Sequence, residues 1–177
     1  GGRLCRSQGL AGVRGQMASM PYIYNGPGFS LQRDKGRFVL PAAFRSTLKE
    51  SSGGMTVCLG KDAVHNCLVG FGVSRKNEMA AQYHREEQTA LERGDPFDAV
   101  KRGMALFGFT DITFDDSGRF VLPREVAISA NIDDQLFFQG AGLFFTARNP
   151  DEMAKMGEGW EGAKAVCASL RAAELEK

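Results

Sequence analysis

The chain has 177 residues, a formal net charge of +1 and a hydrophobic content of 43%. This length supports one sizeable domain or two small ones, and the composition is that of a folded globular protein rather than a disordered one. No apolar run approaches the roughly 20 residues that cross a bilayer, and the N-terminal region has no secretory signal pattern, so we expect a cytoplasmic protein.

The first residues differ in composition from the rest. Residues 1–16 are rich in Gly, Arg and Ser and show no periodicity, and we expect Met17 or Met20 to be the natural start. We therefore expect residues 1–19 to be a disordered or upstream-derived extension.

The next part of the chain predicts four strands and one short helix. In chain order these are strands at 28–33 and 37–40, a helix from 41 to about 49, and strands at 55–59 and 67–71. Pro41 cannot donate to a ladder, so the second strand ends there and a helix can begin. Ser51-Ser52-Gly53-Gly54 has the chemistry that ends a helix.

The segment 76–108 predicts a helical spacer. Its apolar residues are set among charges at helical spacing, and Gly94-Asp95-Pro96 interrupts them, so one or two amphipathic helices are expected.

The last part repeats the earlier order. It predicts strands at 110–114 and 119–122, a helix at 123–129, a hairpin of strands at 136–140 and 143–147, and a C-terminal helix at 153–177. Met and aromatic residues in this last helix are typical of core or subunit contacts.

One octapeptide occurs twice. Asp34-Lys35-Gly36-Arg37-Phe38-Val39-Leu40-Pro41 returns, one residue changed, 82 positions later as Asp116 to Pro123. Asp-x-Gly-Arg is turn chemistry, because Asp can cap its own turn, and Phe-Val-Leu is a short strand. The sequence therefore predicts two copies of one unit, at 27–75 and 109–152. Each copy is too small to bury a core alone, so the copies must pack together, within one chain or between chains.

The charge is uneven. Residues 1–50 carry eight basic residues against Asp34 and Glu50, a balance of +6 within a net charge of +1. Such asymmetry indicates a nucleic-acid face, although a basic tail can also be merely solvated.

The first turn is the candidate site. Arg33, Lys35 and Arg37 alternate, which would place them on one face of a strand, and Arg45 and Lys49 follow on the helix. Arginines suit phosphate contacts and bidentate bonds to guanine. The alternative is structural: Arg37 could pair with Asp34, and Arg119 with Asp115 or Asp116. The second copy is much more acidic, so we expect the first copy to dominate DNA contact.

Catalytic and metal patterns are weak. The two histidines, His65 and His84, fall in different contexts, and the acid pairs fall in turns. The four cysteines have no CxxC pairing, so we expect reduced thiols rather than a zinc site. We expect no enzyme activity, cofactor, metal or small-molecule substrate.

Two Gly-Arg-x-x-x-Pro hairpins joined by a helical spacer resemble the MraZ family of bacterial transcriptional regulators, from about Pro27 to the C-terminal helix. The resemblance implies an α+β fold in which two SpoVT-AbrB-type repeats form a swapped-hairpin, barrel-like β core. It also implies ring-shaped homo-oligomers that bind double-stranded DNA at promoter direct repeats. The regulated genes would be the division and cell-wall cluster, including the protein's own gene, with repression of that cluster and association with the nucleoid.

Candidate DNA-binding residues are Arg33, Lys35, Gly36, Arg37, Arg45, Gly118 and Arg119. The family motif is Asp-x-x-x-Arg, which Asp115 and Arg119 match. In the first copy Arg37 matches, but Arg33 stands where the family has Asp. A protein-binding assembly module, whose hairpins hold partner chains instead of DNA, is the main alternative.

Overall fold

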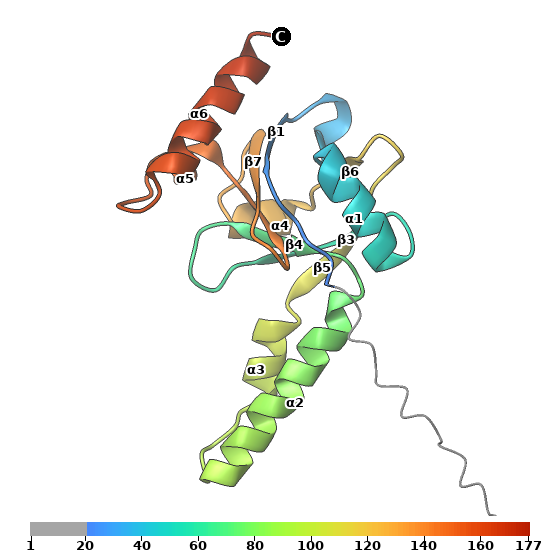
Figure 1. Ribbon diagram of the computed structural model, residues 1–177, viewed down its shortest axis with the longest axis vertical. Helices are drawn as coiled ribbons and strands as arrows, with labels where there is room; N and C mark the ends of the chain where they lie inside the picture. The colour runs from blue at the N-terminus through green and yellow to red at the C-terminus, as the bar shows by residue number, and fades with distance from the viewer. Residues whose placement is uncertain (1–20) are drawn as a thin grey trace, which may run out of the picture.

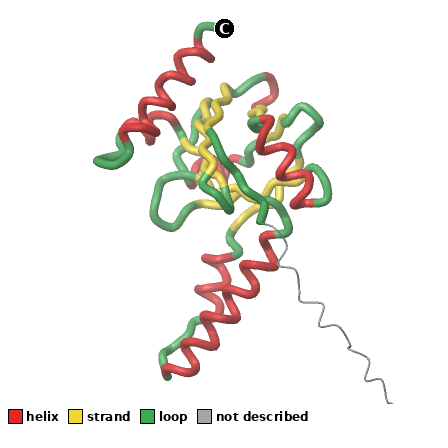
Figure 2. Tube along the Cα trace, viewed as in Figure 1, coloured by secondary structure: helices red, strands yellow, loops and turns green. Residues whose placement is uncertain are grey.

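The computed structural model describes residues 21–177, and the extension expected at 1–19 lies outside them. The strands are β1 (Pro27–Leu31), β2 (Arg37–Val39), β3 (Thr56–Lys61), β4 (Leu68–Phe71), β5 (Phe109–Thr113), β6 (Arg119–Val121), β7 (Gln135–Gly140) and β8 (Phe145–Arg148). The helices are α1 (Ala42–Ser52), α2 (Arg75–Arg93), α3 (Ala99–Leu106), α4 (Arg124–Ser129), α5 (Pro150–Ala154) and α6 (Glu161–Leu175), and a short 3-10 turn, η1, covers Asp34–Gly36. Figures 1 and 2 show a central β core with helices around it. The predicted α+β class is confirmed.

The two copies are interleaved strand by strand. One sheet has the order β1-β7-β8-β4-β3-β5 and a second contains β2 and β6, with every pair antiparallel. Strands of one copy pair with strands of the other in β1–β7, β2–β6, β3–β5 and β4–β8. If each strand is replaced by its counterpart in the other copy, the same six-stranded order results, read from the opposite edge. The core therefore has an internal pseudo-two-fold axis. The hydrogen-bonded ladders form these two sheets, not one closed barrel.

Equivalent phenylalanines meet at the pseudo-axis. Phe38 and Phe120 occupy the same position in the two octapeptides and face each other across β2–β6, with ring centroids 6.1 Å apart. Both are at most 2% exposed. Phe44 of α1 stacks on Phe145 of β8 at 4.7 Å. The copies therefore share one core within a single chain, as the small size of each copy required.

Glycines set the ends of the helices. Gly53 and Gly94 adopt positive φ, at 64° and 70°, and end α1 and α2, as the sequence predicted. The helix expected at 153–177 is instead two helices, α5 and α6. Gly157 and Gly159 lie between them, and Gly159 has a φ of 91° that a continuous helix excludes.

The predicted spacer forms a helical hairpin that projects from the core (Figure 1). Arg102 of α3 donates two hydrogen bonds to the carboxylate of Glu86 on α2, which joins the two helices. Leu91, Val100 and Met104 on this hairpin are each more than 70% exposed. The other long helix, α6, packs across β1 at the opposite end of the molecule. None of the helices within residues 21–177 combines the length and apolarity that crossing a membrane requires.

Candidate nucleic-acid interface

The turn between β1 and β2 is tight. The N–H of Arg33 donates to the carbonyl of Arg37 at 2.7 Å, and the N–H of Gly36 donates to the carbonyl of Arg33 at 3.1 Å. Lys35 and Gly36 both have positive φ, at 62° and 70°, between these residues. This left-handed backbone suits glycine and places Lys35 at the tip.

The turn between β5 and β6 has the same pair of backbone hydrogen bonds, although Gly118 has positive φ there, at 81°, and Ser117, the counterpart of Lys35, does not. Here Asp115 N–H donates to the carbonyl of Arg119 at 3.0 Å, and Gly118 N–H donates to the carbonyl of Asp115 at 2.8 Å. Each of these residues lies 82 positions after its counterpart in the first turn. The repeat predicted from the octapeptide thus extends to these two backbone hydrogen bonds and to the positive φ of the glycine.

The side chains of the second turn neutralise one another. Asp115 accepts hydrogen bonds from the backbone N–H of Ser117 at 3.0 Å, and from the N–H and Nε of Arg119 at 2.9 and 2.7 Å. These hydrogen bonds hold the pKa of Asp115 below its ordinary value, and the bond from the Arg119 backbone N–H has the largest effect. The structural role that the sequence left open for Arg119 is therefore present.

The side chains of the first turn are not neutralised. Arg33 occupies the position of Asp115, and within the part of the chain that the structure describes no ion pair engages Arg33, Lys35 or Arg37. Arg33 and Lys35 are exposed and Arg37 is partly exposed. Asp34 makes no side-chain hydrogen bond to another residue in 21–177, so it does not pair with Arg37.

Two details of the sequence reasoning are wrong. The alternation of Arg33, Lys35 and Arg37 does not follow strand periodicity, because residues 34–36 form a 3-10 turn. Arg33 and Arg37 instead face each other as an isolated bridge across that turn. The turn is also not capped by the Asp inside the repeated octapeptide. Asp115, one residue before that octapeptide, makes the capping bonds.

The antiparallel ribbon of β2 and β6 carries the two turns at its opposite ends. Phe38 and Phe120 point into the core, and because side chains alternate along a strand, Arg37 and Arg119 lie on the outer face. Leu40 N–H donates to the carbonyl of Gly118 at 2.9 Å, which ties the first copy to the second turn. Arg45 of α1 is half-buried against Gly118. All seven predicted residues therefore belong to this ribbon, its two turns and the adjoining α1.

The end of α6 also borders the first turn, which sequence reasoning missed. A hollow of about 280 Å³ is lined by Arg33 and Arg45 together with Glu174 and Lys177. Glu174 pairs with Lys177 at 2.7 Å. No local sequence signal relates residues more than a hundred positions apart, so only the packing of α6 on β1 reveals this neighbour.

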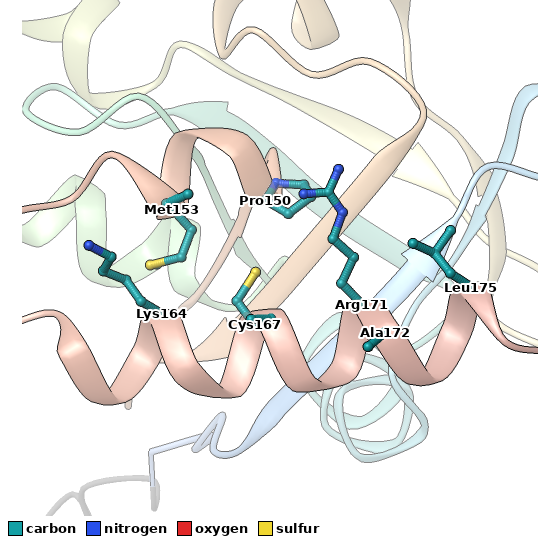
Figure 3. Close-up of a pocket in the computed structure, with 9 residues that line it drawn as sticks. Pro150, Met153, Lys164, Cys167, Arg171, Ala172 and Leu175 are labelled. Carbon is teal, nitrogen blue, oxygen red and sulfur yellow. The ribbon is translucent and has the colours of Figure 1, made fainter.

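A second hollow, between α5 and α6, contains a cysteine. It measures about 240 Å³, and Figure 3 shows Met153 and Cys167 beside it, with Lys164 and Arg171 from α6. Burial raises the pKa of Cys167 to about 11, which disfavours the reactive thiolate. Arg171 pairs with Asp151 at 2.9 Å and Lys164 donates to the carbonyl of Met156 at 3.1 Å, so both cations join α6 to the preceding segment.

The remaining titratable residues give little support to catalysis. His65 contacts Trp160 and His84 contacts Tyr83, in separate parts of the molecule. Cys58 and Cys67 are buried free thiols, and burial raises the pKa of Cys58 to about 12. Within residues 21–177 no three His, Cys, Asp or Glu side chains gather as metal ligands would.

Comparison with known proteins gives one consistent result. The chain is 30% identical over 126 residues to the transcriptional regulator MraZ of Gluconobacter oxydans, across 68% of this chain and 72% of that protein. It is 32% identical over 112 residues to the transcriptional regulator MraZ of a Roseiflexus species, across 63% of this chain and 71% of that protein. It is 30% identical over 117 residues to the MraZ of Rickettsia bellii, across 66% of this chain and 73% of that protein. No family model matches the chain. The relatives and the paired Gly-Arg turns agree: the chain belongs to the MraZ family of transcriptional regulators.

Proposed function

We propose that this transcriptional regulator binds double-stranded DNA through the first turn and the outer face of the β2–β6 ribbon. The observation that carries the proposal is the contrast between the two turns. The same pair of backbone hydrogen bonds closes both turns, but one turn holds a self-neutralised Asp115–Arg119 pair, whereas Arg33, Lys35 and Arg37 of the other form no ion pair within residues 21–177. Unpaired cations at an exposed tip are what phosphate contact requires.

The arginines also suit the reading of bases. A guanidinium offers a planar fork of donors that fits the N7 and O6 atoms of guanine in the major groove. A two-stranded ribbon is narrow enough to enter that groove. We assign phosphate contact to Arg33, Lys35 and Arg45, with Gly36 allowing close approach of the backbone, and base contact to Arg37. Gly118 and Arg119 complete the surface from the second copy.

The target follows from the family resemblance. We infer short direct repeats upstream of the division and cell-wall gene cluster, including the protein's own gene, with repression as the outcome. Action at that site places the protein in the cytoplasm on the nucleoid, in a binding role and not a catalytic one. The interleaved strand pairs support the view that each copy is a SpoVT-AbrB-type repeat.

We further propose that several copies assemble into a closed ring. The helical hairpin supports this, because Leu91, Val100 and Met104 on it are apolar and exposed. Exposed apolar surface of this kind normally marks a subunit contact. A ring would present several first turns to successive direct repeats, so weak individual contacts would add up to firm binding.

Salt titration tests the DNA proposal. The full chain is titrated with labelled duplex from the region just upstream of its gene and with a shuffled duplex of equal composition. Log affinity should fall linearly with log salt, by roughly 0.9 per neutralised phosphate, and the upstream duplex should bind more tightly. A flat salt response would contradict DNA binding and favour the assembly module that holds partner chains.

A further inference from the structure

The second turn lacks room for a side chain at Gly118 because Arg45 fills that space. A Cβ built on Gly118 would lie 2.8 Å from Nε and 3.1 Å from Cγ of Arg45, and would collide with its Cδ. Contacts under 3.0 Å to a real Cβ essentially do not occur, so a side chain at this position would have to displace the end of the Arg45 side chain. The Arg45 side chain, from the first copy, therefore lies directly on the backbone of the second turn.

This contact occurs on one side of the pseudo-axis only. The residue 82 positions after Arg45 is Ala127, which is too short to make the equivalent contact. Gly36, the counterpart of Gly118, would place a Cβ 3.5 Å from Gln32 and near nothing else within 4 Å. The sequence thus departs from its own symmetry at the pair Arg45 and Gly118.

The charge of Arg45 is not used within the described chain. No ion pair of residues 21–177 includes it, and its Nε is buried without a hydrogen-bond partner. A structural arginine normally has its donors satisfied, since an unpaired buried donor is costly. Packing fixes the stem of this side chain, while the residue as a whole remains partly exposed beside the hollow that it shares with Arg33.

We propose that Gly118 is a positioning residue: its bare backbone is a platform that holds the Arg45 guanidinium in place for a DNA phosphate between the two turns. The inference rests on the proposed function and goes beyond it, because it gives the acidic second turn a role that needs no direct contact with DNA. A side chain held in place by packing loses less conformational freedom on binding than a mobile one.

A double-mutant cycle tests this inference. Arg45→Gln keeps an aliphatic chain over Gly118 and removes the positive charge. Gly118→Ala keeps the charge of Arg45 and displaces the aliphatic part of its side chain. Each variant should lose roughly tenfold in affinity for the upstream duplex, and the double variant should lose no more than one of them. Arg45→Gln should also lower the salt slope by roughly 0.9 for each subunit engaged, which a purely structural role would not do.

Two controls separate this effect from strain and from misfolding. Gly142→Ala places alanine at another positive φ, 92°, with nothing within 4 Å of the new Cβ, so it measures backbone strain alone. Lys101→Gln removes an exposed charge from α3, on the helical hairpin and outside the proposed DNA-binding surface. Both should leave affinity within about twofold of the unaltered protein, and thermal unfolding should show every variant to be folded.

The outcomes are distinct. If the unaltered protein does not bind DNA, the proposed function fails. Suppose instead that the unaltered protein binds DNA and that Arg37→Ala weakens this binding. If Arg45→Gln then leaves the affinity and the salt slope unchanged, the positioning inference is overturned while DNA binding by the first turn stands. Additive losses in the double variant would also overturn it, because Gly118 would then act independently of Arg45.

Discussion

Asp115 and Arg119 form an ion pair that spans the second turn, with the carboxylate accepting from both the backbone N–H and the Nε of the arginine, at 2.9 and 2.7 Å. In the first turn Arg33 stands where Asp115 would be, and Arg37 has no such partner in the described chain. Two differences between the copies, Arg33 for Asp115 and Lys35 for Ser117, thus change a turn with a self-neutralised pair into one with three cations that form no ion pair within residues 21–177.

The two equivalent arginines should behave differently on removal. Arg37→Ala removes an unpaired cation beside Arg33 and Lys35, so we expect a loss of about 1–3 kcal/mol of DNA binding per engaged subunit, together with reduced base preference. Arg119→Ala removes a cation that Asp115 already neutralises, and should lower stability more than affinity. Binding is measured after size exclusion has shown equal oligomeric states. Loss of binding in Arg119→Ala with near-normal Arg37→Ala would contradict the choice of the first copy.

Restoring the family motif in the first turn should weaken DNA binding. Arg33→Asp places a carboxylate where Asp115 lies in the second copy, so it should cap the turn and pair with Arg37. Thermal unfolding should then shift upward or stay unchanged, while affinity falls and the salt slope decreases. Arg33→Gln, which removes the charge without adding a cap, is the control and should lose less affinity. Equal affinity in the Asp variant and the unaltered protein would show that the unpaired charge of this turn is not used.

Acid should remove the stabilising effect of Asp115. The folded pKa of this carboxyl lies below its ordinary value of 3.8. Its contribution to folding is therefore complete above that ordinary value, and it is lost as the pH falls through the lower, folded pKa. The free energy of unfolding, measured in denaturant between pH 7 and pH 3, should be smaller for Asp115→Asn than for the unaltered protein at neutral pH. The difference should narrow in acid, and a difference that widened there would contradict the assigned pair.

Charging the helical hairpin should disrupt assembly. Val100 and Met104 lie one turn apart on α3 and are each 71% exposed, so Val100→Asp and Met104→Asp should cost the isolated chain little stability. In an assembly they would bury unpaired charge, so light scattering at micromolar concentration should show smaller species than the unaltered protein. Lys101→Asp on the same helix changes charge more but does not alter the apolar face, and should leave the assembly intact. A monomeric unaltered protein would contradict the ring outright.

Local chemistry made several elements of this protein predictable from its sequence. Pro41 and Pro123 end the strands before them, Gly53 and Gly94 end helices, and the octapeptide marks two equivalent turns. These signals act through neighbouring residues, so they can be read along the chain. The same is true of the basic first turn, whose cations lie within a few positions of one another.

Only the tertiary structure decided how the copies combine. Antiparallel pairing of β1 with β7 and β3 with β5 joins residues at least 49 positions apart, and no local pattern specifies such partners. The same holds for Arg45 on Gly118 and for Glu174 beside Arg33, because each contact depends on packing between elements that are distant in sequence. Residue types determined which turns could carry charge. The folded core determined which charges remain unpaired, since a carboxylate neutralises an arginine only where the backbone brings the two within hydrogen-bonding distance.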